Sequence, residues 1–216
     1  MDKHIMCRVT LFAILLLPYL QVFCEDDTEC LKSFKESVTD TNNYLASWNF
    51  ANEFSGYVCS FAGITCWNNQ ENKVLALQLR LAGLSGSFPS GLWKCASMQI
   101  LDLSQNDFIG PIPDDICSQL PYTTVLDLSR NGLTGSIPNN LQDCLYLNIL
   151  RLQHNQLSGS LPGGIGILPR LHELDVSYNN LSGVIPSSYA TRPASAFENN
   201  PALCGPPLSK VCSSGV

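Results

Sequence analysis

The chain has 216 residues, of which 45% are hydrophobic and only 14% are charged. Eighteen acidic residues outnumber twelve basic ones, which gives a formal net charge of −6. Binding to nucleic acid relies on clustered Lys and Arg, so this composition excludes nucleic acid as an expected partner. The length is sufficient for one or two domains with a substantial core.

Residues 1–24 have the organisation of a secretory signal peptide. Basic residues precede an apolar stretch at 9–20, which at about a dozen residues is too short to span a bilayer. We expect cleavage after Cys24, so that the mature chain begins at Glu25. No later segment has the character of a transmembrane helix or a lipid-anchor tail, and the sequence as given predicts a secreted product.

The expected mature region holds eight cysteines, an even number that indicates disulfides in an exported protein. Two pairs are close in sequence and lie at the two ends of the repeated region described next. Three of the other four cysteines lie within the repeats, where they can instead be buried thiols. Zinc is a further alternative, although the sequence contains no Cys-x-x-Cys pair. The favoured pairs are Cys59–Cys66, Cys204–Cys212, Cys30–Cys95 and Cys117–Cys144.

An internal repeat with steps of 24 or 25 residues is the dominant pattern of the chain. Each unit has a Leu-x-Leu motif on an expected short strand and, in the same register, a turn of the type Gly-x-Ile-Pro. One unit cannot bury its leucines alone, but stacked units pair their strands into a continuous parallel sheet. The Leu-x-Leu motifs lie at 77–79, 101–103, 126–128 and 150–152, and the fifth unit has Leu-Asp-Val at 174–176.

An Asn follows the second Leu by three residues in four of the five units, whereas the first unit has Ala82. The Asn amides can bond backbone groups that the bend leaves unpaired, which predicts a ladder along the stack. The predicted ladder residues are Asn106, Asn131, Asn155 and Asn179.

A stack of repeats needs caps, because its end leucines would otherwise meet water. Around residues 29–37, apolar side chains recur at helical spacing, and nearby aromatic residues are expected to cover the first repeat. The predicted organisation is a signal peptide at 1–24, an N-terminal cap at 25–73, five repeats at 74–193, and a C-terminal cap and tail at 194–216. The aromatic residues expected in the N-terminal cap are Trp48, Phe50, Phe54, Phe61 and Trp67.

The turn at 181–186, Leu-Ser-Gly-Val-Ile-Pro, resembles plant extracellular leucine-rich repeats, in which this element forms an additional strand and twists the solenoid. The segment 48–67, ending Cys-Ser-Phe-Ala-Gly-Ile-Thr-Cys-Trp, resembles the plant-type N-terminal cap. With its five repeats, nearly the whole mature chain is similar to ectodomains of short receptor-like kinases and pseudokinases that sequester somatic-embryogenesis-type co-receptors. The resemblance implies an α/β repeat fold, a right-handed leucine-rich-repeat solenoid with disulfide-stapled caps. Those proteins continue into a transmembrane helix and a kinase or pseudokinase domain, which the sequence as given does not contain.

No motif in the sequence indicates catalysis. Nucleophile elbows, zinc-protease motifs and kinase glycine-rich loops are missing from it. His154 and His172 are interpreted as polar residues beside the strands. The column of Asp102, Asp127 and Asp175 is interpreted as a solvated face rather than a cation site. We therefore expect no enzyme, no metal and no cofactor.

Binding is the function that the repeats predict, because side chains beside each strand line up on a rigid concave surface. This face is polar and mixed in sign, which suits a protein partner better than a hydrophobic small molecule. Just before the strands, two Tyr and one Arg occupy equivalent positions and are expected to lie side by side at the lateral edge, as residue types enriched in hot spots. Alternatively, those rings pack on the convex loops. The candidate partner-binding residues are Tyr122, Tyr146, Arg170, Asp127, Arg130, Arg151, His154, Asp175 and Tyr178.

Asn180, followed by Leu and Ser, is the only N-glycosylation motif in the chain and is expected to point outward. By resemblance, we predict an extracellular binding module, in the apoplast or at the outer face of the plasma membrane, that holds a co-receptor ectodomain and regulates immune or growth signalling. The alternatives are an inhibitor of a microbial cell-wall-degrading enzyme and a peptide-binding receptor ectodomain.

Overall fold

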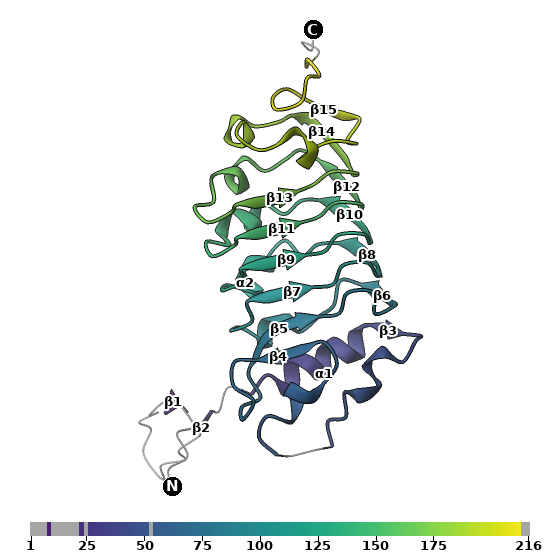
Figure 1. The fold of residues 1–216 in the computed structure, drawn as a ribbon, viewed down its shortest axis with the longest axis vertical. Helices are drawn as coiled ribbons and strands as arrows, with labels where there is room; N and C mark the ends of the chain where they lie inside the picture. The colour runs from purple at the N-terminus through teal and green to yellow at the C-terminus, as the bar shows by residue number, and fades with distance from the viewer. Residues whose placement is uncertain (1–7, 10–21, 24–25, 52–53, 213–216) are drawn as a thin grey trace, which may run out of the picture.

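The computed structural model describes residues 8–9, 22–23, 26–51 and 54–212. Apart from two short antiparallel strands, β1 (Arg8–Val9) and β2 (Val22–Phe23), the expected signal peptide and its cleavage site lie outside these residues. The chain from residue 26 onward forms a rod of stacked repeats with a cap at each end (Figure 1).

The predicted Leu-x-Leu motifs form a parallel sheet along one face of the rod. Their register is regular, since Leu101 pairs with Leu77 on one side and with Leu126 on the other. The leucines of the motifs point into a continuous core, whereas the residues between them face outward. One antiparallel strand from the N-terminal cap closes the lower end. The strands are β4 (Ile64–Cys66), β5 (Val74–Gln78), β7 (Ile100–Asp102), β9 (Val125–Asp127), β11 (Ile149–Arg151) and β13 (Glu173–Asp175).

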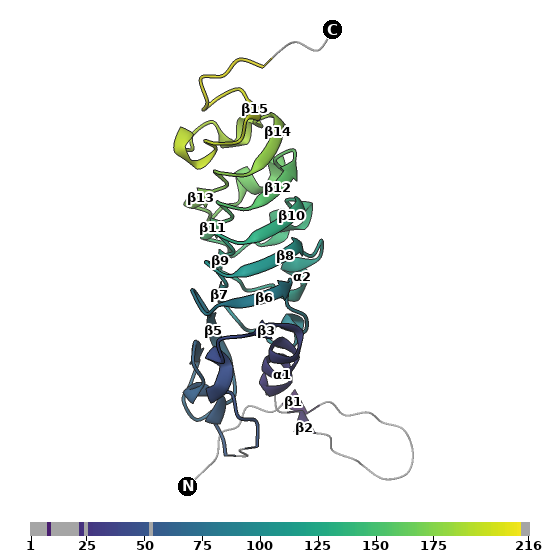
Figure 2. The same ribbon diagram turned by 90° about the vertical axis from the view of Figure 1, so that its right-hand side faces the viewer.

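A second sheet runs along the rod beside the first (Figure 2), and it confirms the additional strand implied by the plant-type turns. It is built mostly from the Leu-x-Gly or Phe-x-Gly segment of each repeat. Both caps contribute a strand, which is antiparallel at the N-terminal end and parallel at the C-terminal end. The strands are β3 (Thr39–Asp40), β6 (Leu84–Ser87), β8 (Asp107–Pro111), β10 (Gly132–Ser136), β12 (Gln156–Gly159), β14 (Asn180–Val184) and β15 (Ala202–Cys204).

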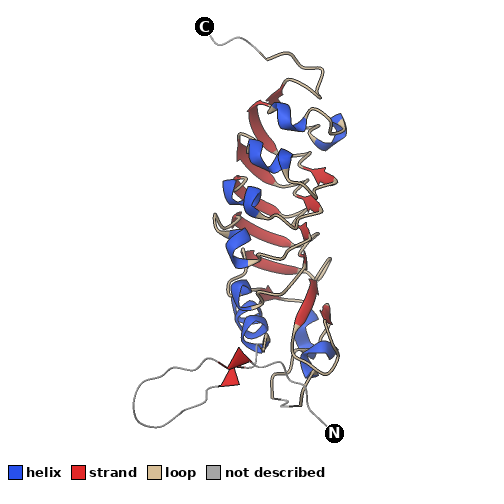
Figure 3. Cartoon of the chain, turned by 90° about the vertical axis from the view of Figure 1, so that its left-hand side faces the viewer, coloured by secondary structure: helices blue, strands red, loops and turns tan. Residues whose placement is uncertain are grey.

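Short helices complete each turn and stack along one side of the rod (Figure 3). They lie between the second sheet and the next strand of the first sheet, and each buries one or two apolar side chains. They are η3 (Leu92–Lys94), α2 (Ile116–Gln119), η4 (Asn139–Asp143), η5 (Gly163–Ile167) and η6 (Ser187–Tyr189), followed by η7 (Ala194–Ala196) in the C-terminal cap.

The N-terminal cap contains the predicted helix, α1 (Thr28–Ser37), and the short helices η1 (Tyr44–Ser47) and η2 (Tyr57–Ser60). Trp48 and Phe61 stack in its core with ring centroids 5.7 Å apart. The expectation that Phe54 and Trp67 cover the first repeat is wrong, because they are 62% and 49% exposed. Tyr57 is buried there instead, and Trp67 donates its indole N–H to the carbonyl of Ser97 at the surface.

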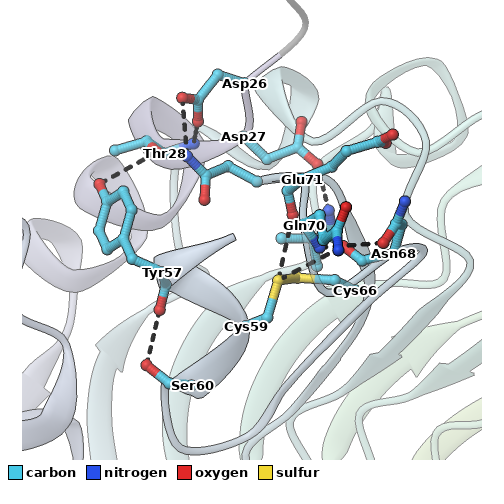
Figure 4. The surroundings of a disulfide bond; sticks show 12 residues. Asp26, Asp27, Thr28, Tyr57, Cys59, Ser60, Cys66, Asn68, Gln70 and Glu71 are labelled. Atoms are coloured by element: carbon cyan, nitrogen blue, oxygen red, sulfur yellow. Dashed lines mark hydrogen bonds between the residues drawn. A yellow bond between two sulfur atoms is a disulfide. The ribbon is translucent and has the colours of Figure 1, made fainter. Parts of the chain in front are cut away.

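Four disulfides link the cysteines in the pairs that the sequence favoured. Cys59–Cys66 holds η2 against β4, close to Tyr57, whose hydroxyl donates to Thr28 (Figure 4). Cys30–Cys95 ties α1 to the first repeat across 65 residues of sequence. Cys117–Cys144 joins two neighbouring repeats at their helices, and Cys204–Cys212 closes the C-terminal cap.

The predicted Asn ladder is present, and each amide serves two neighbouring repeats. Asn179 donates to the carbonyls of Leu152 at 3.0 Å and Val176 at 3.1 Å, and its oxygen accepts the N–H of Leu157 at 3.0 Å. Asn200 makes the same three kinds of bond in the C-terminal cap. The ladder therefore extends one step beyond the residues predicted from the repeats.

Candidate protein-binding surface

Each of the parallel strands β5, β7, β9, β11 and β13 leads to a residue with a left-handed backbone, just before the ladder position. Within the repeats, φ at these residues lies between 54° and 58°. A side-chain-bearing residue rarely adopts this conformation, and here the backbone bonds of the stack hold it; the N–H of His154, for example, donates to the carbonyl of Ser177 at 3.1 Å. The residues are Leu81, Gln105, Arg130, His154 and Tyr178.

We define the concave edge as Arg130, His154 and Tyr178, which follow one another in consecutive repeats. The rings of His154 and Tyr178 stack with centroids 4.1 Å apart and planes 14° apart. Burial and, to a smaller extent, the charge of Arg130 lower the pKa of His154, while Asp175 opposes this shift. The neutral imidazole is therefore favoured, and the concave edge presents a flat aromatic pair beside one guanidinium.

The predicted column of aspartates is held by bonds within the sheet. Asp102, Asp127 and Asp175 each accept the backbone N–H of the Ser two residues later, at 2.9, 3.0 and 2.9 Å. No group of three or more His, Cys, Asp or Glu among the described residues is arranged to hold a metal ion.

Arg151 is fixed between two carboxylates. Its Nε lies 2.6 Å from Glu173 and its Nη1 lies 3.3 Å from Asp127, so the guanidinium crosses three adjacent strands. These contacts, chiefly the hydrogen bond to Glu173, raise the pKa of Arg151. Glu173 was not predicted as a site residue, although its charge stands in a column otherwise occupied by Ala76, Ile100, Val125 and Ile149.

We define the lateral ledge as Tyr122, Tyr146 and Arg170. The two rings have centroids 5.7 Å apart, and the guanidinium carbon of Arg170 lies 5.2 Å from the Tyr146 centroid. Tyr122 is 50% and Tyr146 is 41% exposed, so about half of each side chain remains available for contact. The three side chains thus lie side by side, as their equivalent positions predicted.

Arg192 lies against this edge and was not predicted as a site residue. Its guanidinium donates to the backbone carbonyls of Leu171 and His172, at 2.5 and 3.0 Å. His172, which the sequence analysis interprets as a polar residue beside the strands, is exposed.

Asn180 is exposed at the start of β14, whereas its neighbour Asn179 is buried in the ladder. β14 belongs to the second sheet, so Asn180 is not on a strand of the first sheet. In the part of the chain from residue 26 to 212, excluding 52–53, no helix has the length and hydropathy to cross a membrane.

Two family models match the chain in the order that the fold requires. The leucine rich repeat N-terminal domain matches residues 24–67, and the Leucine Rich Repeat model matches 97–119, 122–144, 146–168 and 170–191. Together with the capped solenoid, these matches define the class of the molecule as a leucine-rich-repeat protein.

The comparisons with relatives narrow this class. The chain is 55% identical over 124 residues to the inactive LRR receptor-like serine/threonine-protein kinase BIR2 of Arabidopsis thaliana, of which the matched region covers 20%. A second Arabidopsis relative, the probable LRR receptor-like serine/threonine-protein kinase At1g69990, is 50% identical over 143 residues, 24% of its length. The chain therefore spans about a fifth to a quarter of these curated relatives.

Solved ectodomains match over almost their whole length. The crystal structure of the BIR2 ectodomain from Arabidopsis thaliana superposes with a TM-score of 0.85 at 47% identity, covering 87% of this chain and 98% of that one. The crystal structure of the BIR3–SERK2 complex from the same plant gives a TM-score of 0.83 at 46% identity, covering 87% and 100%. The chain belongs to the plant leucine-rich-repeat receptor ectodomains and is closely similar to those of BIR2 and BIR3.

Proposed function

We propose that this chain is an extracellular module that holds the ectodomain of a co-receptor kinase and so regulates immune or growth signalling. The observation that carries the proposal is its 46% identity over the full length of an ectodomain in the BIR3–SERK2 complex. Cleavage of the N-terminal segment and N-glycosylation at Asn180 are further parts of the proposal, since both belong to an exported protein.

The contact surface that we propose comprises the concave edge, the lateral ledge and the Asp127, Arg151 and Asp175 side chains between them. Tyr and Arg dominate interface hot spots because they combine apolar area with hydrogen-bonding groups. On this chain they are also pre-ordered, since Arg170 rests on Tyr146, and Arg151 is held by two carboxylates. Pre-ordered side chains lose little rotamer entropy on binding, which favours affinity.

No enzymatic role is proposed, because the relative BIR2 is described as an inactive kinase and the chain matches the solved BIR2 ectodomain. In this proposal the module contributes to signalling through the protein that it binds. Competition for a shared co-receptor is the simplest such contribution, since one bound ectodomain is withheld from other receptors.

The test is binding of purified co-receptor ectodomain, with the SERK2 ectodomain as the probe, measured by calorimetry or surface plasmon resonance. Tyr146→Ala and Arg170→Ala should each weaken binding by about 2 kcal/mol, a roughly 30-fold rise in Kd. Tyr44→Ala is the matched control, because Tyr44 is a similarly exposed tyrosine in the N-terminal cap and should leave Kd unchanged.

Wild-type affinity in both ledge variants would remove the lateral ledge from the proposal. No binding of wild-type chain to the SERK2 ectodomain, together with binding to a microbial polygalacturonase, would overturn it in favour of an enzyme inhibitor.

A further inference from the structure

Asn131 differs from the other ladder residues in the residue that follows it. It is the only Asn in the chain that precedes a Gly. Glycine has no side chain, so its backbone nitrogen has unhindered access to the side-chain carbonyl of a preceding Asn. Asn is also one of the thermolabile residues of proteins. The dipeptide most prone to deamidation therefore lies at a ladder position. The other ladder residues within the repeats, Asn106, Asn155 and Asn179, precede Asp107, Gln156 and Asn180.

The packing of the second sheet accounts for the glycine at 132. A β-carbon added to Gly132 would lie 3.1 Å from Cγ2 of Ile109 and 3.3 Å from the carbonyl oxygen of Phe108. Both residues belong to β8, with which β10 pairs. Close contact between these two strands thus favours a glycine directly after a structural Asn.

The folded chain protects Asn131 from deamidation through hydrogen bonds. Its side-chain nitrogen donates to three backbone carbonyls at 3.0, 3.1 and 3.2 Å, and its oxygen accepts the N–H of Phe108 at 3.0 Å. Attack by the Gly132 nitrogen requires the side-chain carbonyl carbon of Asn131 to turn toward it, which breaks these bonds. Burial is not the protection, because Asn131 is only partly buried. The reaction therefore requires the ladder to open locally.

We propose that Asn131 is a self-modification site that reacts when the ladder opens. The Gly132 nitrogen attacks the side-chain carbonyl carbon of Asn131, and a C–N bond forms between them. The side-chain NH2 leaves as ammonia with the proton that the Gly132 nitrogen loses. Water then hydrolyses the cyclic imide at either of its two carbonyls, which leaves aspartate or isoaspartate at position 131. The reaction needs no co-reactant other than water.

Either product prevents the ladder from forming again as before. Aspartate has no NH2 to donate to the three carbonyls, and isoaspartate also adds a methylene to the backbone. This change falls directly after Arg130, a residue of the concave edge whose φ of 55° the stacked backbone holds. A chain that has opened once thus carries a permanent covalent change beside the concave edge. The proposal goes beyond co-receptor binding, because the reaction takes place within the chain itself.

The test compares the folded chain with the chain unfolded in guanidinium chloride, at the same mildly alkaline pH and temperature and with the disulfides intact. Peptide mass spectrometry measures deamidation at each Asn, and methylation by an isoaspartate methyltransferase measures isoaspartate. Asn155 is the matched internal control, because it makes ladder bonds of the same kind but precedes Gln156. In the unfolded chain we expect Asn131 to deamidate at least about 10-fold faster than Asn155, and folding should slow Asn131 at least about 10-fold.

Gly132→Ala should slow deamidation of Asn131 at least about 5-fold in the unfolded chain, where the result does not depend on whether the variant folds. After refolding, deamidated wild-type chain should have a Tm at least about 5 °C below that of chain unfolded only briefly.

Three results would each overturn the proposal: equal rates at Asn131 in the folded and unfolded chain, equal rates at Asn131 and Asn155 in the unfolded chain, or an unchanged Tm after deamidation. None of these measurements uses the co-receptor, so this proposal and the proposed function can fail separately.

Discussion

Replacing Asn179 by Asp tests whether the ladder carries the stability that its geometry indicates. Asn179 is 8% exposed and satisfies the carbonyls of Leu152 and Val176 and the N–H of Leu157. The substitution preserves the size of the side chain and its acceptor oxygen. It replaces the donor NH2 by a carboxylate oxygen, which cannot donate to the two carbonyls and is repelled by them. With about 1 kcal/mol for each hydrogen bond and more for a buried group left unpaired, we expect a loss of about 3 kcal/mol. For a domain of this size that lowers Tm by about 6–12 °C.

The assay is thermal and urea unfolding, followed by circular dichroism with the disulfides intact. Asn139→Asp is the control, because Asn139 is exposed and its side chain makes no hydrogen bond within the described residues, so its Tm should stay close to that of wild type. If Asn179→Asp unfolds within about 1 °C of wild type, the backbone groups find other partners and the reasoning about the ladder is refuted.

Three further predictions follow from the surface and the disulfides. The pKa of His154 is lower in the folded chain than its ordinary value of 6.5, so as pH falls below 6.5 the unfolded chain binds a proton at His154 first. The free energy of unfolding should therefore decrease as the pH falls from 6.5 to the folded-state pKa, and His154→Gln should reduce this decrease in urea titrations. Opening Cys117–Cys144 by a double Ser substitution should cost about 3.5 kcal/mol for its 27-residue separation, read as a shift in urea midpoint. Arg151→Gln should lower the free energy of unfolding by about 1 kcal/mol. Adding Glu173→Gln should lower it little further, because the first substitution has already broken the ion pair, and a double-mutant cycle measures this coupling.

The repeats could be predicted because their periodicity records the packing directly. A leucine that must face the core in every turn recurs at every turn, so the strands, the ladder and the side-by-side placement of Tyr122 and Tyr146 all follow from alignment of the chain on itself. Burial in the N-terminal cap could not be predicted in this way. Phe54 and Tyr57 are three residues apart with similar rings, and only the path of the intervening chain decides that Tyr57 is inside.

The side-chain contacts of the surface also could not be predicted from the sequence. Alignment of the repeats predicted the position of Arg151 correctly but not its ion pairs with Asp127 and Glu173, because equivalent positions identify neighbours without showing which side chains contact one another. Asn200 was recoverable, since Phe197-Glu-Asn-Asn200 has the spacing of Leu-x-x-Asn with Phe in place of Leu. The 21-residue step from Asn179 to Asn200 concealed it.

Through Asn200, the C-terminal cap makes the same hydrogen bonds to the last repeat that a further repeat would make. A duplication or deletion of one unit in the gene would present the cap with the same two kinds of backbone group that it meets now, a carbonyl and an N–H of the last repeat. The length of the binding face can therefore change during evolution by whole repeats while the C-terminal cap stays the same.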